Sequence, residues 1–224
     1  MTLAIATDGS GRKDGRAGYG VTARWLARGE DASLPPAPGA EPTLTEHYGP
    51  VDTDPKSHMW LGAAKATNNT GELTAMHVAL RTAEAHAVRG DFVRILPDSM
   101  MAICTTTGAW KSPRHRTLVS RNVGMLATLR TRGVRVQFSH IRAHRGHTMN
   151  ERADSLADLG AQTTTHFSQG RTPAPATGHI PVHFDATPPS DSPYTTPGQR
   201  ARLILAVDRW AEYIPRGRTT STFC

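Results

Sequence analysis

The sequence predicts an α/β protein in which helices cover the faces of a mixed, five-stranded β-sheet. Three observations predict this fold: short apolar runs that end at glycine or at Pro-Asp, apolar residues at helical spacing after capping residues, and the order of these segments. That order is strand-strand-strand-helix-strand-helix-helix-strand-helix. A chain of 224 residues can bury a full core, and its two cysteines exclude a disulfide framework.

Five segments have the composition of strands. Residues 3–7 form an apolar run that stops in a glycine-rich turn, and residues 19–26 continue it as a hairpin. We assign residues 59–61 to a third strand. Residues 92–96 form a strand that ends at Pro-Asp, and apolar residues alternate over 134–138 in the last strand.

Four helices are predicted between and after these strands. Asn69 opens the first, which runs to about residue 89 with apolar residues at helical spacing. Ser99 caps a short second helix, and Gly133 closes the third. Asn150 caps the fourth helix, which carries small and apolar residues on one face.

The prolines divide the chain. Six of the 16 lie within residues 28–57 and seven within residues 166–198. Because proline removes a backbone donor and fixes φ, we interpret the first segment as an irregular insertion into a folded domain of residues 1–165, and the second as a linker or draped tail. Residues 199–224 form a C-terminal amphipathic helix that docks on the core or on a protein partner. Its apolar stripe comprises Leu203, Val207, Trp210 and Ile214.

The net charge of +7 is unevenly placed. Residues 99–153 hold ten basic residues against the single acid Glu151, a net charge of +9, which leaves −2 for the rest of the chain. This excess indicates a basic face that binds a polyanion. The alternative is that helices scatter the arginines around the molecule.

No apolar run approaches the roughly 18 residues of a membrane span. Residues 1–10 lack the basic and long apolar regions of a signal peptide. We therefore expect a cytoplasmic, monomeric protein with no membrane partner.

Four acidic residues each have an ordinary structural explanation. Asp8 suits an Asx turn, and Glu72 suits a capping box opened by Asn69 three residues earlier. Asp98 can serve as a turn residue or a helix cap after a strand. Asp154 lies one turn into the last helix, where the helix dipole stabilises a negative charge.

Together, these four carboxylates indicate chemistry. Strand ends of one sheet lie side by side, and helix starts can direct further carboxylates to the same place. Such groups repel one another unless a cation lies between them, and an all-oxygen set suits Mg²⁺ or Mn²⁺. Two such ions about 3.5–4 Å apart activate a water and stabilise the leaving oxygen of a phosphodiester. The pattern is typical of a nuclease.

Four motifs in this order resemble those of type 1 ribonucleases H. They are Thr7-Asp8-Gly9-Ser10, then Thr67-Asn68-Asn69-Thr70-Gly71-Glu72-Leu73, then Asp98-Ser99, and finally His144-Arg145-Gly146-His147 with Asn150-Glu151-Arg152-Ala153-Asp154-Ser155-Leu156-Ala157. The resemblance covers roughly residues 1–162. It implies a ribonuclease H-like catalytic domain within residues 1–165.

The resemblance implies an endonuclease that cuts the RNA strand of RNA–DNA hybrids and leaves a 5′-phosphate and a 3′-hydroxyl. Asp8, Glu72, Asp98 and Asp154 would hold two Mg²⁺ ions, with Mn²⁺ as a substitute. His144 would assist proton movement or product release, and His147 would orient the loop that carries it.

The resemblance also implies a binding surface for the hybrid. Asn68, Asn69 and the turn at Gly9, Ser10 and Gly11 would contact the minor groove and sense 2′-hydroxyls. A basic loop would grip the DNA strand through Trp110, Lys111, Arg114 and Arg116, although Trp110 suits core packing equally well. Met100 stands where relatives often carry a glutamine that approaches the nucleic acid.

Two other functions stay open. One is a nuclease of the same fold that acts on DNA, which the second and fourth motifs argue against. The other is a binding module without catalysis, which would have lost a metal carboxylate.

Overall fold

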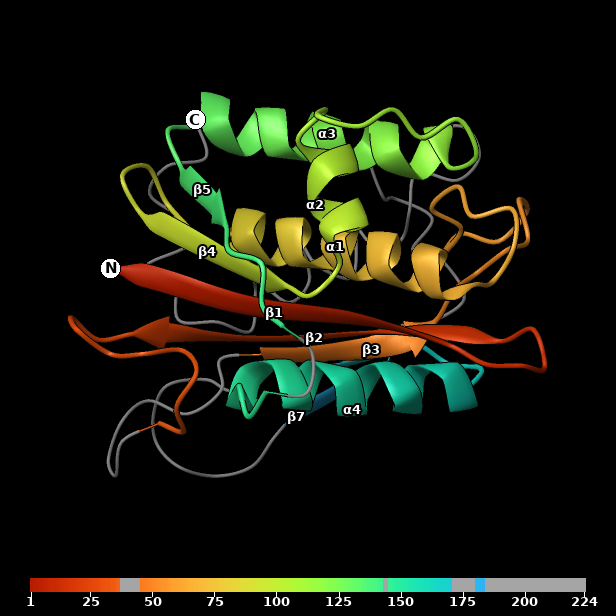
Figure 1. Cartoon of the computed structure of the whole chain (residues 1–224), viewed down its shortest axis with the longest axis horizontal. Coiled ribbons are helices and arrows are strands. Elements are labelled where there is room, and N and C mark those ends of the chain that lie inside the picture. Colours follow the sequence, from red (N-terminus) through yellow and green to blue (C-terminus); the bar gives the residue numbers. More distant parts are fainter. Residues whose placement is uncertain (37–44, 143–144, 171–179, 184–224) are drawn as a thin grey trace.

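The computed structural model describes residues 1–36, 45–142, 145–170 and 180–183. Its strands form one seven-stranded sheet in the order β5-β4-β1-β2-β3-β6-β7 (Figure 1). The strands are β1 (Thr2–Gly11), β2 (Ala17–Leu26), β3 (Thr45–Pro50), β4 (Phe92–Pro97), β5 (Arg135–Phe138), β6 (Phe167–Gly170) and β7 (Ile180–His183). β1, β4 and β5 run parallel and the other pairs are antiparallel, so the predicted mixed sheet is confirmed.

Helices cover both faces of the sheet, as expected. They are α1 (Asn68–His86), α2 (Met100–Thr106), α3 (Arg116–Thr131) and α4 (Thr148–Gln162). Figure 1 shows α1, α2 and α3 on one side and α4 on the other. None of the helices among the described residues is long and apolar enough to cross a membrane.

The third strand is not where the sequence predicted it. Residues 59–61 form no strand, and β3 instead lies inside the segment that we predicted to be an irregular insertion. Residues 45–50 alternate between buried and partly buried, which is the pattern of a strand with one covered face. Met59 and Leu61 pack into the core from a loop. The prolines around β3 concealed its short alternation.

Two helix starts also differ from the prediction. Thr67 caps α1, in a capping box with Thr70. Glu72 therefore lies beyond the capping box and has no capping role. His147 caps α4 by accepting the backbone N–H of Asn150, so Asn150 is inside the helix rather than its cap. Ser99 caps α2 as predicted.

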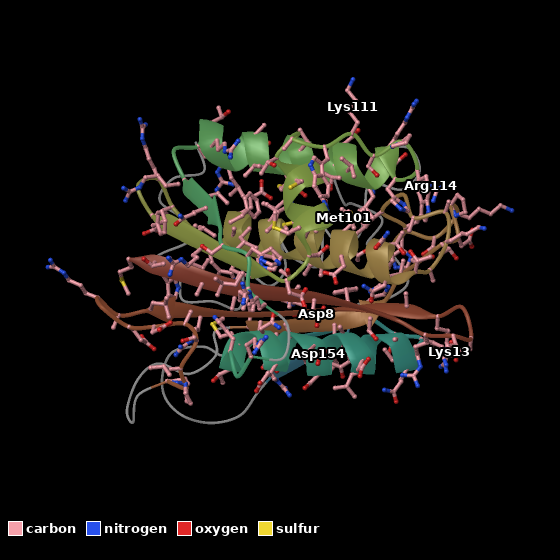
Figure 2. All side chains as sticks on the ribbon, viewed as in Figure 1. Asp8, Lys13, Met101, Lys111, Arg114 and Asp154 are labelled. Carbon is pink, nitrogen blue, oxygen red and sulfur yellow. The ribbon has the colours of Figure 1, made fainter. Side chains whose placement is uncertain are left out.

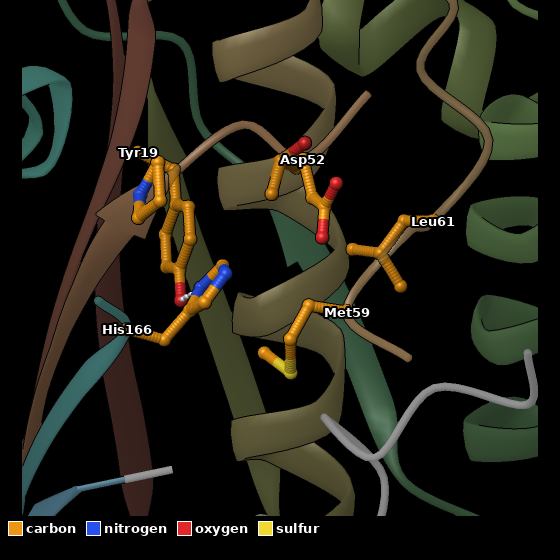
Figure 3. Close-up of a pocket in the computed structure, with 7 residues that line it drawn as sticks. Tyr19, Asp52, Met59, Leu61 and His166 are labelled. Carbon is orange, nitrogen blue, oxygen red and sulfur yellow. Dashed lines mark hydrogen bonds between the residues drawn. The ribbon is translucent and has the colours of Figure 1, made fainter. Parts of the chain in front are cut away.

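Two further strands, β6 and β7, extend the sheet beyond the five strands that the sequence predicted in number. β6 pairs with β3, and β7 with β6, so the proline-rich segment begins as part of the sheet. Tyr48 stacks on Phe167 with ring centroids 5.0 Å apart. Tyr19 and His166 form a hydrogen bond of 3.1 Å in the lining of a small pocket that Asp52, Met59 and Leu61 also line (Figure 3). Burial lowers the pKa of His166 to about 4. The helix predicted over residues 199–224 lies outside the described residues.

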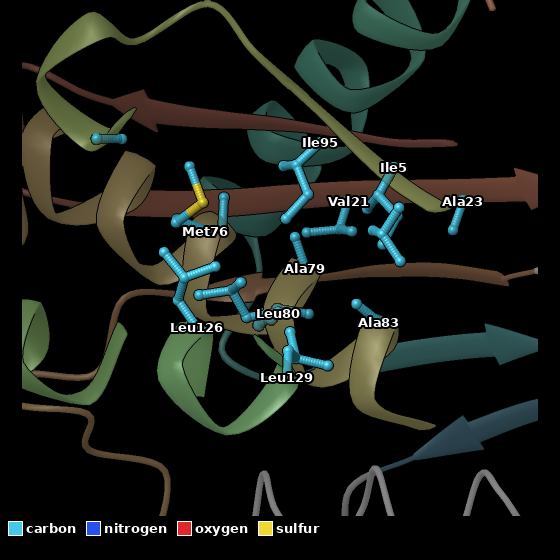
Figure 4. Close-up of a cluster of buried hydrophobic side chains, with 14 of the residues drawn as sticks. Ile5, Val21, Ala23, Met76, Ala79, Leu80, Ala83, Ile95, Leu126 and Leu129 are labelled. Atoms are coloured by element: carbon cyan, nitrogen blue, oxygen red, sulfur yellow. The ribbon is translucent and has the colours of Figure 1, made fainter. Parts of the chain in front are cut away.

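The main core lies between the sheet and the pair α1 and α3. Figure 4 shows this cluster of aliphatic side chains. Its members include Ile5, Val21, Ile95, Met76, Leu80, Leu126 and Leu129. The cluster on the α4 face mixes alanines, among them Ala4, Ala6 and Ala153, with Leu26, Leu96 and Met149. Small side chains allow α4 to lie close to the sheet, and this closeness positions the site described next.

Candidate active site

Asp8 lies on β1, an interior strand of the sheet between β4 and β2. It faces Gly20 of β2 in an antiparallel pair and is 7% exposed. One carboxylate oxygen accepts the backbone N–H of Gly9 at 2.7 Å. β1 continues to Gly11, so Asp8 is within a strand and the Asx-turn explanation is wrong.

Glu72 lies beside Asp8 because β1 and α1 pack very closely. A Cβ on Gly9 would stand 2.1 Å from the backbone N of Glu72, so only glycine allows this approach. Glu72 is 5% exposed, and its Oε2 is buried without a hydrogen-bond partner among the described residues. A buried carboxylate oxygen of this kind is unfavourable unless it binds a proton or a cation.

Asp98 follows β4, the parallel neighbour of β1. The register pairs Thr7 with Pro97. Asp8 and Asp98 are the residues that directly follow this pair, so they lie side by side. One carboxylate oxygen from each of Asp8, Glu72 and Asp98 lies within 4.8 Å of the others. We call these three residues the carboxylate cluster.

Asp154 approaches Asp8 from α4, on the other face of the sheet. A Cβ on Gly20 would lie 2.1 Å from the carbonyl O of Ala153, so glycine at this position lets α4 pack against β2. The Asp154 side chain is close enough to raise the pKa of Asp8 (Figure 2). Asp154 is outside the three-residue carboxylate cluster but borders it.

Burial and mutual repulsion perturb the carboxylate cluster. Burial, followed by the charge of Asp98, raises the pKa of Asp8 to about 8, although the Gly9 N–H opposes this shift. Burial and the charge of Asp8 raise the pKa of Glu72 to about 9. Without a cation, both groups therefore bind protons more readily than an ordinary carboxyl group.

The carboxylate cluster fits a hard divalent cation. All of its donors are carboxylate oxygens, the ligand type that Mg²⁺ and Mn²⁺ take. Oε2 of Glu72 lacks a donor among the described residues. Burial, followed by repulsion between the carboxylates, raises the pKa values of Asp8 and Glu72, and a cation would offset both effects. The residues present therefore suit the metal that the sequence predicted.

The predicted hybrid-binding residues of β1 and α1 lie at adjoining ends of these two elements. Asn68 and Asn69 are exposed at the start of α1. A Cβ on Gly11 would lie 2.6 Å from the backbone N of Asn68, so the end of β1 adjoins that helix start. Ser10 donates a hydrogen bond to Asp158 of α4. His144 lies outside the described residues.

The loop between α2 and α3 is exposed and basic. Trp110 is 53% exposed, so the core-packing explanation for this residue is wrong. Lys111, Arg114 and Arg116 are also exposed, and Figure 2 shows Lys111 and Arg114 pointing outward from this edge of the molecule. The loop offers an aromatic ring and cations to a ligand.

The ten cations of residues 99–153 do not share one face. Arg152 lies on α4 and pairs with Glu46 of β3. Arg132 lies on the α3 side of the sheet, where it pairs with Glu84. The scattered alternative is therefore correct, and the α2–α3 loop holds only part of the excess charge.

Sequence reasoning missed two residues beside the predicted ones. Asp158 follows Asp154 by one helical turn, and that spacing could have revealed it. His140 follows β5, and its Nε2 lies 2.9 Å from the carbonyl O of Asp98. No pattern in the sequence indicates this second contact, because it depends on the pairing of β4 with β5.

Comparison with known proteins agrees with this geometry. The model of the RNase H family matches residues 1–162. A relative named Ribonuclease H, from Methylorubrum extorquens (strain PA1), is 27% identical over 185 residues, which cover 80% of this chain and 75% of the relative. The chain therefore belongs to the RNase H family. It is an enzyme, a ribonuclease H.

Solved structures share the fold. The N-terminal RNase H domain of rv2228c from Mycobacterium tuberculosis, solved as a fusion with maltose binding protein, superposes with a TM-score of 0.50 at 22% identity and covers 72% of this chain and 99% of that one. LC9-RNase H1, a type 1 RNase H with the type 2 active-site motif, has a TM-score of 0.51 at 20% identity, covering 74% of each chain.

Proposed function

We propose that this ribonuclease H hydrolyses the RNA strand of RNA–DNA hybrids with the help of two divalent metal ions. The observation that carries the proposal is the carboxylate cluster, in which Asp8, Glu72 and Asp98 bring oxygens within 4.8 Å of one another. Oε2 of Glu72 supports it, because this buried oxygen has no hydrogen-bond partner in the described part of the chain and a cation would stabilise it. Membership of the RNase H family supports the choice of substrate.

We assign the cation-binding role to the carboxylate cluster together with Asp154, with Mg²⁺ as the ion and Mn²⁺ as a substitute. Bound divalent ions would supply activation of the attacking water and stabilisation of the departing 3′ oxygen, and the products would be a 5′-phosphate and a 3′-hydroxyl. Asp8 belongs to the carboxylate cluster and also lies beside Asp154, so it would help to hold the metal together with both. His144 would move protons at the leaving group or assist product release.

The chain's own surface would select the hybrid. Ser10, Asn68 and Asn69 lie beside the carboxylate cluster, at the end of β1 and the start of α1. Their hydroxyl and amide groups can hydrogen-bond to 2′-hydroxyls, which only the RNA strand carries. Trp110 and Lys111 of the α2–α3 loop would contact the DNA strand by stacking and by charge.

Cleavage of end-labelled substrates tests this function. We expect cutting of the RNA strand of a hybrid in Mg²⁺ and none in EDTA, with duplex DNA, duplex RNA and single strands left intact. Asp98→Asn should abolish cleavage but retain hybrid binding. Asp54→Asn, in an exposed loop, is the matched control and should cut normally. Cleavage of duplex DNA instead would favour the DNA nuclease, and binding without any cleavage would favour the binding module.

Three further assignments remain predictions: a cytoplasmic location, a monomeric state and a protein partner held by the C-terminal helix. Deleting residues 199–224 tests the last of them. We expect cleavage of the hybrid to survive the deletion and the partner to be lost.

A further inference from the structure

Residues 27–34, which we call the support loop, follow β2 and lie against the start of α4 (Figure 1). The backbone N–H and the side-chain hydroxyl of Thr148 both donate to the carbonyl O of Ser33, each at 3.1 Å. Ala32 is 3% exposed and packs in the same apolar cluster as Ala153 of α4. The support loop therefore contacts the first turns of α4 by hydrogen bonds and by packing.

One buried arginine holds the support loop in place. Arg24 of β2 is 2% exposed, and its guanidinium forms an ion pair of 2.6 Å with Glu30. The same guanidinium donates to the carbonyl oxygens of Leu34 at 2.9 Å and Asp31 at 3.2 Å. The second carboxylate oxygen of Glu30 accepts the backbone N–H of Ala27 at 2.8 Å. Arg24 thus binds the middle and the far end of the support loop directly, and Glu30 links it to the near end at Ala27.

This arrangement connects Arg24 to the active site. Thr148 is the first residue of α4, and Asp154 follows six residues later, about 9 Å along the helix axis. Asp154 borders Asp8, so a shift of the first turn of α4 moves a carboxylate of the site. We propose that Arg24 is a positioning residue, which acts through the support loop to hold Asp154 against the carboxylate cluster.

This inference rests on the proposed function, since it gives Asp154 a share in metal binding. It also assigns a role to the beginning of the segment that the sequence marked only as an insertion. Supporting groups around a metal site typically change metal affinity by about 10- to 100-fold when they are removed. A support that served only folding would instead change stability and leave metal affinity unaltered.

A second buried ion pair provides the matched control. Arg81 of α1 is 5% exposed and pairs with Glu84 three residues later. It lies on the opposite face of the sheet from α4. Arg81→Met therefore removes a buried guanidinium of similar burial without touching the support loop.

The test measures Mn²⁺ binding to the free protein by calorimetry, well below the unfolding temperature of each variant. We expect Arg24→Met to weaken binding about tenfold and Arg81→Met to leave it within twofold while also lowering stability. Arg24→Lys, which keeps the charge but not the fork of donors, should recover part of the affinity. Equal affinities in Arg24→Met and wild type, or an equal loss in Arg81→Met, would overturn the proposal.

A double-mutant cycle with Asp154→Asn measures the coupling between the two residues in Mn²⁺ affinity, which a loss of stability alone would not produce. If Arg24 acts through Asp154, the double variant should bind Mn²⁺ no more weakly than Asp154→Asn itself, whereas additive losses contradict the proposal. Should Arg24→Met not fold, Glu30→Gln takes its place, and an unchanged affinity there counts against the proposal. Wild-type protein that binds Mn²⁺ but cuts no hybrid would refute the proposed function and leave this inference standing.

Discussion

Ser10 donates a hydrogen bond to Asp158 at 2.5 Å, and this bond joins the end of β1 to α4. Because the hydroxyl proton is directed to Asp158, the lone pairs of Ser10 remain available as acceptors. A 2′-hydroxyl can donate to them, and deoxyribose cannot. The orientation of Ser10 is therefore suited to recognising an RNA strand.

We expect Asp158→Ala to raise KM for the hybrid about fivefold, the equivalent of about 1 kcal/mol for one hydrogen bond, with kcat little changed. Asp158→Asn is the control, since its amide oxygen can still accept from Ser10. Steady-state cleavage of a labelled hybrid measures both constants. Equal KM values for the two variants would contradict the assigned role of Asp158.

Gly9→Ala should inactivate the enzyme. The added Cβ would overlap the backbone of α1 at Glu72, so α1 must move away from β1. We expect a loss of about 3 kcal/mol in the free energy of unfolding and of at least about 100-fold in kcat. Gly124→Ala on α3, where a Cβ meets nothing within 4 Å, should gain about 1 kcal/mol and cut normally. Denaturant unfolding and cleavage rates check both variants.

Stability in EDTA should fall as the pH rises. Folding raises the pKa of Asp8 to about 8 and that of Glu72 to about 9, against about 4 in the unfolded chain. The folded protein thus holds protons that the unfolded chain has lost, so this contribution is complete below pH 4 and disappears through pH 8 to 9. Urea unfolding at several pH values measures the slope. Glu72→Gln should show a shallower decline, and a parallel decline would sink the assignment.

Adding Mg²⁺ should stabilise the folded protein at a pH where the metal-free protein has lost stability. At pH 8, Mg²⁺ should raise the unfolding temperature of the wild-type protein, because the ion binds the folded state and replaces the protons of the carboxylate cluster. The increase should disappear in Asp8→Asn. Differential scanning calorimetry with and without Mg²⁺ checks this, and an equal increase in the variant would place the ion elsewhere.

The α2–α3 loop should contribute salt-dependent affinity. Replacing both Lys111 and Arg114 by glutamine should reduce the slope of log K against log salt by about 2, since each phosphate contact contributes about 0.9. Arg130→Gln is the control, because this exposed residue lies at the far end of α3. Hybrid binding at several salt concentrations, with Asp98→Asn as the background to prevent cleavage, gives the slopes.

Much of this fold could be predicted because local signals and global arrangement agree. The capped helix α2 and the continuous apolar run of β1 carry strong local patterns. β3 could not be found, because six residues among prolines give too short an alternation. β6 depends on pairing with β3, which no local pattern encodes.

The residues of the candidate site could be predicted from the sequence, but their contacts could not. Asp8, Glu72 and Asp98 were identified by motif, but their closeness depends on Gly9 allowing α1 to approach β1. That distance is a property of packing. The contact of His140 with the carbonyl of Asp98 likewise requires the strand register, which the sequence does not display.

The pairing of β6 with β3 has a consequence for handling the protein. The family match ends at residue 162, so a domain trimmed to that boundary would lose β6 and expose the backbone amides of β3. An uncovered strand of this kind recruits strands from other molecules and promotes aggregation. We therefore expect a form shortened to residue 162 to aggregate more readily than the full chain, because β3 would lose the strand that covers its edge.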